Sequence, residues 1–233
     1  MTQTQSTTTY RAFLKQQAEF RAFETQEFDQ LTTHLQVKQY AKGQILFDQG
    51  DRRDRFYYVI KGVIRLERVD ASGSFSFINY VKAQKAFPYR GLDLDPDYPY
   101  TAMALTPITI AVFDMADFET VVAENRAVSQ QVIRQMSQLI ERTETRLQRM
   151  VTSSAARRVQ QALLILGTDL GQPINETEIE IPYPMTLIEL AHISGTTRET
   201  AGQVVNKLVA AGTISYQRKR FRFSPSVLGA LTK

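Results

Sequence analysis

About forty consecutive residues, from Asp114 to about Ser153, contain neither glycine nor proline. These two residues are the ones that most often end helices, so a stretch of this length without them predicts a long helix. Asp114 or Asp117 is the expected N-cap, because a carboxylate accepts hydrogen bonds from the free amides of the first turn. The predicted helix exceeds the usual three to four turns, and the remaining elements must be arranged around it.

Within this stretch the residues of one helix face recur in steps of three and four. They are Ile133, Met136, Ile140, Thr143, Leu147 and Met150. Glutamates and arginines between positions 141 and 149 flank this narrow face, a pattern typical of a helix that pairs with a second helix. A parallel two-fold homodimer is the simplest closed arrangement. The alternative is that the face packs on the chain's own β domain, although Phe118, Val121 and Val122 already supply a face for that purpose.

The region before the long helix, from Val37 to Phe113, has the pattern of an antiparallel β-barrel or roll. Short runs rich in β-branched and aromatic residues alternate there with turn residues, chiefly glycine. The runs are Gln44–Phe47, Phe56–Ile60, Val63–Val69, Phe75–Val81, Tyr100–Ala104 and Ile108–Phe113. The loosely helical spacing between Tyr10 and His34 predicts one or two short helices upstream.

The composition excludes several kinds of chemistry. The chain has no cysteine, which excludes disulfides, cysteine-ligated iron–sulfur clusters and thiolate nucleophiles and fits a reducing cytoplasm. The two histidines, His34 and His192, have no neighbouring ligand residues in the sequence, so neither a metal site nor a haem site is expected. No apolar run is long enough to span a bilayer, and no nucleophile set or glycine-rich phosphate loop indicates an enzyme.

The segment from Met185 to Gly212 predicts a helix-turn-helix. Thr186 is the expected N-cap of the first helix, with Glu189 completing a capping box. Gly195 supplies the tight turn, and Thr196 or Thr197 caps the second helix. One face of the second helix is expected to be buried, namely Thr200, Ala201, Val204, Val205 and Leu208. The second helix would then present its polar face outward.

That polar face carries the predicted base readers, Arg198, Glu199 and Gln203. Arginine pairs with guanine, glutamate accepts from cytosine, and glutamine pairs with adenine. After Gly212, two short β runs around a basic turn predict the hairpin of a winged helix-turn-helix. The expected contacts to DNA phosphates are Thr186, Thr196, Thr197, Asn206, Arg218, Lys219 and Arg220, with Arg222 as a further cation of the wing. Together these features predict binding to double-stranded DNA.

Three segments resemble the CRP/FNR family of bacterial transcription regulators, and the resemblance extends over nearly the whole chain. They are Lys42–Asp51, Phe56–Val63 and Gly195–Gly202. The resemblance implies an α+β chain with an N-terminal cyclic-nucleotide-binding-type β-roll, a long dimerisation helix and a C-terminal winged helix-turn-helix. Combined with the segments above, it predicts an N-terminal helical segment (1–36), a β-roll sensor domain (37–113), a dimerisation helix (114–152) and a DNA-binding domain (153–233).

The sequence departs from the family at its cyclic-AMP site. Members that bind cyclic AMP carry a Gly-Glu pair and then an Arg-Ser pair before an alanine, and alignment on Ala102 puts Tyr100 and Thr101 in place of Arg-Ser. A tyrosine cannot neutralise a cyclic phosphate, and three aspartates between positions 93 and 97 would repel it. Control by cyclic AMP is therefore not expected, and the effector is unknown. Candidate contacts for another small molecule are Phe87, Tyr89, Arg90, Tyr100 and Thr101, unless these aromatic residues are simply core of the roll.

The expected function is that of a cytoplasmic, homodimeric transcription regulator that binds palindromic DNA. By position alone, the loops Arg52–Arg55 and Asp169–Glu176 lie where members of the family contact RNA polymerase. The alternative is a small-molecule-responsive signalling module whose C-terminal domain binds protein.

Overall fold

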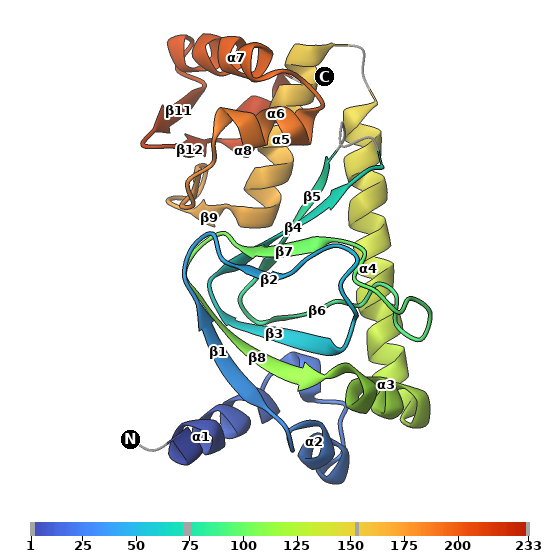
Figure 1. Ribbon diagram of the computed structural model, residues 1–233. Coiled ribbons are helices and arrows are strands. Elements are labelled where there is room, and N and C mark those ends of the chain that lie inside the picture. Colours follow the sequence, from blue (N-terminus) through green and yellow to red (C-terminus); the bar gives the residue numbers. More distant parts are fainter. Residues whose placement is uncertain (1–2, 72–75, 152–153, 232–233) are drawn as a thin grey trace. The chain divides into compact units, whose positions relative to one another are not determined.

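The computed structural model describes residues 3–71, 76–151 and 154–231 (Figure 1). The chain divides into two compact units. One comprises Met1–Arg68 and Asn79–Ile140, and the other comprises Val69–Ile78 and Glu141–Lys233. The predicted α+β architecture is confirmed, with an N-terminal β-roll, a long helix and a C-terminal winged helix-turn-helix. No helix among the described residues is both long and apolar enough to cross a membrane.

The first unit contains a roll of two four-stranded sheets. Their strand orders are β1-β8-β3-β6 and β2-β7-β4-β5. The strands are β1 (Gln36–Tyr40), β2 (Ile45–Phe47), β3 (Arg55–Lys61), β4 (Val63–Val69), β5 (Ser76–Lys82), β6 (Lys85–Phe87), β7 (Thr101–Ala104) and β8 (Ile108–Asp114). All strand pairs with a described register are antiparallel. Each of the six predicted β runs overlaps one of these strands, although Phe75 at the start of one run lies outside the described residues, whereas β1 and β6 were not predicted.

Strand β3 is an unbroken apolar run because both of its faces are buried. Successive side chains of a strand point to opposite faces. Tyr57 and Val59 face the interior between the two sheets, whereas Phe56 and Tyr58 belong to a second core on the other side. At the end of β3, Gly62 makes the turn with φ of +90°, and an added Cβ would lie 2.5 Å from the Pro107 carbonyl oxygen. No larger residue fits that turn without displacing the neighbouring loop.

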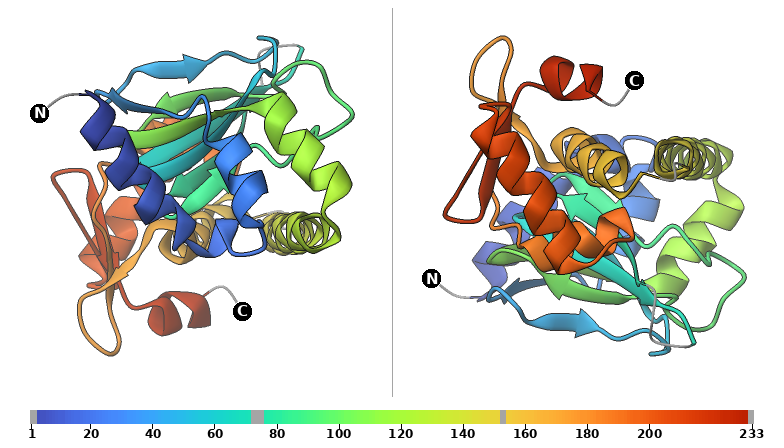
Figure 2. Two further views of the ribbon diagram at one scale, coloured as in Figure 1. Left: turned by 90° about the horizontal axis from the view of Figure 1, so that it is seen from below. Right: turned by 90° about the horizontal axis from the view of Figure 1, so that it is seen from above.

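Helices cover the outer face of the sheet that contains β3. They are α1 (Gln3–Lys15), the short 3-10 helix η1 (Ala18–Phe20), α2 (Thr25–Leu31), α3 (Met115–Glu124) and the start of α4 (Arg126–Met150). Viewed from below, α1 and α2 lie across this sheet (Figure 2, left). Phe118 and Val121 of α3 are buried in this core, as are Val128 and Val132 of α4. The first turns of α4 therefore belong to the roll.

The prediction of one uninterrupted helix from Asp114 is wrong, because the helix breaks at Asn125. This residue is extended (φ −101°, ψ 108°), and its Oδ1 accepts from the amides of Ala127 (2.8 Å) and Val128 (3.2 Å). Its Nδ2 donates to the carboxylate of Glu27 on α2 (2.7 Å). Asn125 therefore caps α4 and ties it to α2. Asp114 precedes α3, but its side chain makes no capping hydrogen bond.

The second unit is built on α5 (Ala155–Leu170). Its remaining elements are β9 (Gln172–Pro173), β10 (Ile179–Ile181), α6 (Leu187–Ser194), α7 (Arg198–Ala210), β11 (Ile214–Gln217), β12 (Arg220–Phe223) and α8 (Pro225–Ala230). The sheet order is β11-β12-β10-β9. Gly167 lies inside α5, and Gly171 follows the last residue of the helix. A Cβ at Gly167 would come within 2.7 Å of Ile179 and 2.9 Å of Phe223, so glycine lets the helix approach the sheet closely.

Replacing Asn125 with alanine removes both the cap of α4 and the hydrogen bond to Glu27. The N-cap contribution alone predicts a loss of about 1 to 2 kcal/mol in the free energy of unfolding of the first unit. Urea unfolding followed by circular dichroism measures this loss. Gln130→Ala, at an exposed position of the same helix, is the control and should change stability by less than about 0.5 kcal/mol. Equal stabilities for the two variants would contradict the capping role.

Candidate nucleic-acid interface

Helices α6 and α7 form the predicted helix-turn-helix, and the structure confirms the residues that begin and end them. The Thr186 hydroxyl oxygen accepts from the Glu189 amide (3.1 Å) at the start of α6. Gly195 adopts the left-handed conformation (φ +57°) that ends α6. The Thr197 hydroxyl oxygen accepts from the Thr200 amide (3.2 Å), so Thr197 rather than Thr196 caps α7.

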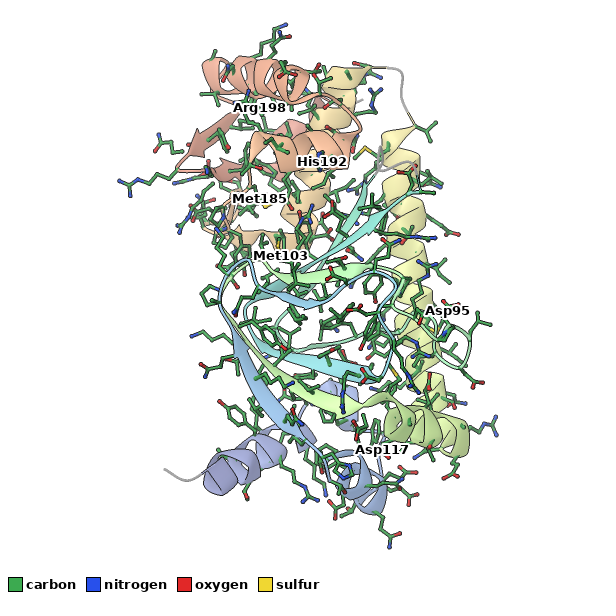
Figure 3. All side chains as sticks on the ribbon, in the orientation of Figure 1. Asp95, Met103, Asp117, Met185, His192 and Arg198 are labelled. Atoms are coloured by element: carbon green, nitrogen blue, oxygen red, sulfur yellow. The ribbon has the colours of Figure 1, made fainter. Side chains whose placement is uncertain are left out.

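The two faces of α7 differ as the sequence predicts. Ala201, Val205 and Leu208 are buried, and Thr200 and Val204 are half-buried at the edges of that face. The opposite face exposes Arg198, Glu199, Gln203 and Asn206. Figure 3 shows Arg198 on α7 and His192 on α6. The first two turns of α7 thus present Arg198, Glu199 and Gln203, three side chains that can reach the edges of bases.

Glu199 is held in its charged form at the start of α7. Its own backbone amide and the Thr197 hydroxyl hydrogen-bond the carboxylate, and the charge of Arg198 adds to them, so its pKa lies below the usual range. A carboxylate near a helix N-terminus is also favoured by the helix dipole. An ionised glutamate accepts hydrogen bonds and donates none. Its suitable partner on a base edge is therefore an amino group such as that of cytosine.

The predicted phosphate contacts differ in what their hydroxyl groups can donate. Thr186 uses its oxygen as an acceptor in the cap, which leaves its proton for an anion. Thr196 does not have this freedom. Because the Ser194 hydroxyl donates to the Leu190 carbonyl (2.7 Å), the contact of 2.8 Å between Ser194 and Thr196 requires Thr196 to be the donor. Thr196 must rotate before it can contact a phosphate.

Arg158 of α5 anchors the turn between α6 and α7, and this role was not predicted. Its Nε donates to the Ser194 carbonyl (3.1 Å) and its Nη2 to the Gly195 carbonyl (3.5 Å). A cation at this place also complements the C-terminal end of the α6 dipole. The sequence gives no signal for this contact, because Arg158 and Ser194 are far apart along the chain. The neighbouring Arg157 is exposed, so the residue type alone does not tell which arginine anchors the turn.

The wing is a tight hairpin with two cations at its tip. Arg218 and Lys219 both have positive φ (50° and 63°), and together with Arg220 they are exposed. The Lys219 carbonyl accepts from the Met185 amide (2.7 Å), which ties the wing to the segment before α6. Arg222 is different, because it pairs with Glu178 (2.5 Å) and lowers the pKa of that carboxyl. The expectation that Arg222 contacts phosphate is not supported by this geometry.

The face of α4 predicted for dimerisation is exposed in the single chain. The exposed fractions of Ile133, Ile140 and Leu147 are 60%, 56% and 66%. Met136 and Thr143 are exposed as well, and Met150 is half-buried. Leu139, which was not predicted, is exposed beside them. Because these side chains are exposed, the structure does not support the alternative in which this face packs on the chain's own roll.

The five candidate effector contacts do not line one cavity. Phe87 points into the interior of the roll, where Phe47 stacks on Tyr98 with ring centres 3.7 Å apart and Tyr100 packs beside them. Tyr89 lies in the core on the other side of the sheet, and its hydroxyl group donates to Glu19 (3.2 Å). Arg90 is exposed, and the Thr101 hydroxyl accepts from the Gln49 amide (3.0 Å). The described interior is thus filled by aromatic rings.

Arg53 is buried rather than part of a surface loop. Its Nη2 pairs with Glu119 of α3 (2.7 Å), and its Nε donates to the Asp95 carbonyl (2.8 Å). It therefore holds the loop that follows β6 against α3 instead of pointing to solvent. In the loop Arg52–Arg55, the residues that remain available to a partner protein are those on either side of Arg53.

The histidine His34 has two acidic neighbours that its sequence context did not indicate. Its Nδ1 lies 3.3 Å from the Asp114 carboxylate, and an oxygen of Asp117 is also close. Arg55 forms an ion pair with the same Asp114. We assign no metal to this exposed cluster, because a guanidinium already balances the carboxylate that a cation would need.

Two family models match the chain. That of the cyclic nucleotide-binding domain matches residues 37–125, and that of the Crp-like helix-turn-helix domain matches residues 157–224. The chain is 26% identical to a global nitrogen regulator of Synechococcus elongatus, over 83% of this chain and 88% of the relative. It is 23% identical to a CRP-like cAMP-activated global transcriptional regulator of Mycobacterium tuberculosis, over 89% and 92% of the two chains. A transcriptional regulator of the CRP/FNR family from Thermus thermophilus has the same fold, with a TM-score of 0.64, 24% identity and coverage of 84% and 98%.

Replacing Arg158 with methionine keeps the length of the side chain and removes the hydrogen bonds to the turn. Because hydrogen bonds from a charged group are lost, we expect the free energy of unfolding of the second unit to fall by about 1 to 2 kcal/mol, measured by urea unfolding. Arg157→Met is the control and should lie within about 0.5 kcal/mol of the wild type. If both variants unfolded like the wild type, Arg158 would not anchor the turn.

Proposed function

This chain belongs to the CRP/FNR family of transcription regulators, and from that premise we propose that it binds palindromic DNA as a homodimer through α7 and the wing. The observation that carries the proposal is the exposed face of the first two turns of α7. It brings Arg198, Glu199 and Gln203 together on a helix whose cap and preceding turn are fixed by hydrogen bonds. A helix in the major groove reads bases through its N-terminal residues.

In this proposal the contacts to the DNA backbone come from the segments before and after α7 in the sequence. Thr186 and the amides at the start of α7 supply one set, and Arg218, Lys219 and Arg220 of the wing supply the other. Asn206 supplements them on the exposed face of α7. Contacts of this kind set the register of a protein on DNA without reading its sequence.

The exposed face of α4 supports the homodimer. A stripe of large apolar side chains with charged flanks loses its contact with water when two helices pair in parallel. The two copies of α7 are then related by a two-fold axis, and the matching DNA site is an inverted repeat with half-sites about one helical turn apart. Recruitment or blocking of RNA polymerase would follow from binding at such a site, with Arg52 and the segment Asp169–Glu176 as candidate contacts.

We also propose that cyclic AMP is not the effector. The relative from Mycobacterium tuberculosis is described as cAMP-activated, whereas this chain has Tyr100 and Thr101 where the family resemblance places the Arg-Ser pair of a cyclic-AMP site. Phe47, Phe87 and Tyr98 fill the interior of the roll, and the hydroxyl of Tyr100 carries no positive charge with which to balance a cyclic phosphate. The only arginine among the candidate contacts, Arg90, is exposed.

The proposed function is tested by selecting binding sites from random duplexes with the wild type and with Arg198→Ala. The wild type should return an inverted repeat. The variant should lose about 1 to 3 kcal/mol at one base pair of each half-site and tolerate other bases there. An identical consensus from both proteins would rule out Arg198 as a base reader, and recovery of no consensus by the wild type would contradict sequence-specific binding.

Replacing Leu147 with lysine places a charge in the pairing face of α4. We expect monomers by sedimentation velocity at micromolar concentration, because the charge cannot be buried between two helices. Affinity for the full inverted repeat should fall about 100-fold, since each domain would bind alone. Gln148→Lys adds the same charge at a neighbouring exposed position outside the pairing face and should remain dimeric. A dimeric Leu147→Lys protein would place the interface elsewhere.

A further inference from the structure

Arg146, near the end of α4, contacts two other segments of the second unit at once, strand β5 and helix α5. Its Nη1 donates to the Ile78 carbonyl of β5 (3.2 Å), and its Nη2 lies 3.2 Å from the Asp169 carboxylate near the end of α5. Its guanidinium carbon also lies 5.9 Å from the centre of the Phe77 ring. One side chain therefore joins the last turns of α4, strand β5 and the first helix of the winged-helix domain.

The burial of Arg146 distinguishes it from the other arginines in this part of α4. The exposed fraction of its side chain is 15%, and that of Asp169 is 23%. The two paired atoms, Nη2 of Arg146 and Oδ2 of Asp169, are both buried. Arg142 and Arg149 on the same helix are exposed. Salt screens a buried ion pair much less than a surface pair, so this contact persists at physiological ionic strength.

The segments that Arg146 joins carry the residues proposed to pair and to bind DNA. The last turns of α4 contain Leu147 and Met150 of the pairing face. Helix α5 is held at its far end by Asp169, and near its start Arg158 anchors the turn that precedes α7. Because α5 is a continuous helix of 16 residues, a fixed position at one end also fixes the other.

We propose that Arg146 is a positioning residue, which sets the orientation of the winged-helix domain on the last turns of α4 (residues 141–150) and thereby the separation of the half-sites that a dimer can bind. This inference rests on the proposed function. Arg146 touches no base or phosphate in this account. Its loss leaves each domain able to bind a half-site but removes the fixed distance between two domains, so the gain from binding both half-sites decreases.

The test compares wild type, Arg146→Ala, Arg146→Lys and Arg149→Ala on duplexes with the selected spacing, with spacings changed by one or two base pairs, and with a single half-site. Two inserted base pairs should weaken wild-type binding at least 10-fold. Arg146→Ala should lose about 10-fold at the selected spacing and vary less than about 3-fold across all spacings. On the single half-site all four proteins should agree within about 2-fold, and sedimentation should show that all are dimers.

The control, Arg149→Ala, removes an exposed arginine from the same turn of α4 and should keep the wild-type spacing profile. Arg146→Lys retains the charge facing Asp169 but not the planar group that reaches Ile78, so its profile should be intermediate. An unchanged spacing profile for Arg146→Ala overturns the inference. Equal losses on the half-site and the full site also overturn it, because they indicate a damaged domain rather than a misplaced one.

Hydrogen exchange separates this inference from the proposed function, since it requires no DNA. Backbone amides of β5 and α5 should exchange at least 10-fold faster in Arg146→Ala than in Arg149→Ala. If the wild type bound no DNA, the proposed function would fail while the exchange result still decided whether Arg146 joins these segments. Equal exchange in the two variants overturns the inference.

Discussion

The apolar face of α4 is the constraint on which the rest of the molecule depends. Its first turns are satisfied within the chain, because Val128 and Val132 are buried against the roll. From Ile133 onward the same helix exposes large apolar side chains that no described part of the chain covers. Contact of these side chains with water is unfavourable, and a second copy of the helix removes it without any change in the fold. In the proposed homodimer, this helix links the β-roll domain to the partner chain.

The DNA-binding end depends on a smaller set of polar contacts. Caps at Thr186 and Thr197, the left-handed Gly195 and the guanidinium of Arg158 fix the turn between α6 and α7. These contacts hold the first turn of α7 in one conformation before DNA is present, which lowers the entropy lost on binding. Stacked aromatic rings fill the interior of the roll, and this filling supports the proposal that cyclic AMP is not the effector.

Features that depend on local sequence could be predicted, and those that depend on distant partners could not. The caps at Thr186 and Thr197 and the glycine turn at Gly195 are encoded within a few residues, and the structure confirms them, whereas the expected cap at Asp114 makes no capping hydrogen bond. The break at Asn125 was missed because it is stabilised partly by Glu27, nearly one hundred positions earlier. Nothing in the sequence distinguishes three arginines from surface cations, namely Arg53, Arg146 and Arg158. Their partners are buried or distant along the chain, so only the fold reveals them. The candidate effector contacts were grouped by sequence, but Phe87 at the end of β6 belongs to the core inside the roll, whereas Tyr89, in the segment after this strand, packs in the core on the other side of the sheet.

Pairing along α4 is the central claim, and cysteine cross-linking tests it most directly because the chain contains no cysteine of its own. In a parallel dimer, Ile140→Cys brings two thiols together at the two-fold axis, whereas Gln138→Cys on the same helix points away from the partner. Under mild oxidation we expect covalent dimers from Ile140→Cys and none from Gln138→Cys, and the cross-linked dimers should bind the inverted repeat as tightly as the wild type. Cross-linking at position 138 but not at 140, or cross-linked dimers unable to bind DNA, would contradict the account.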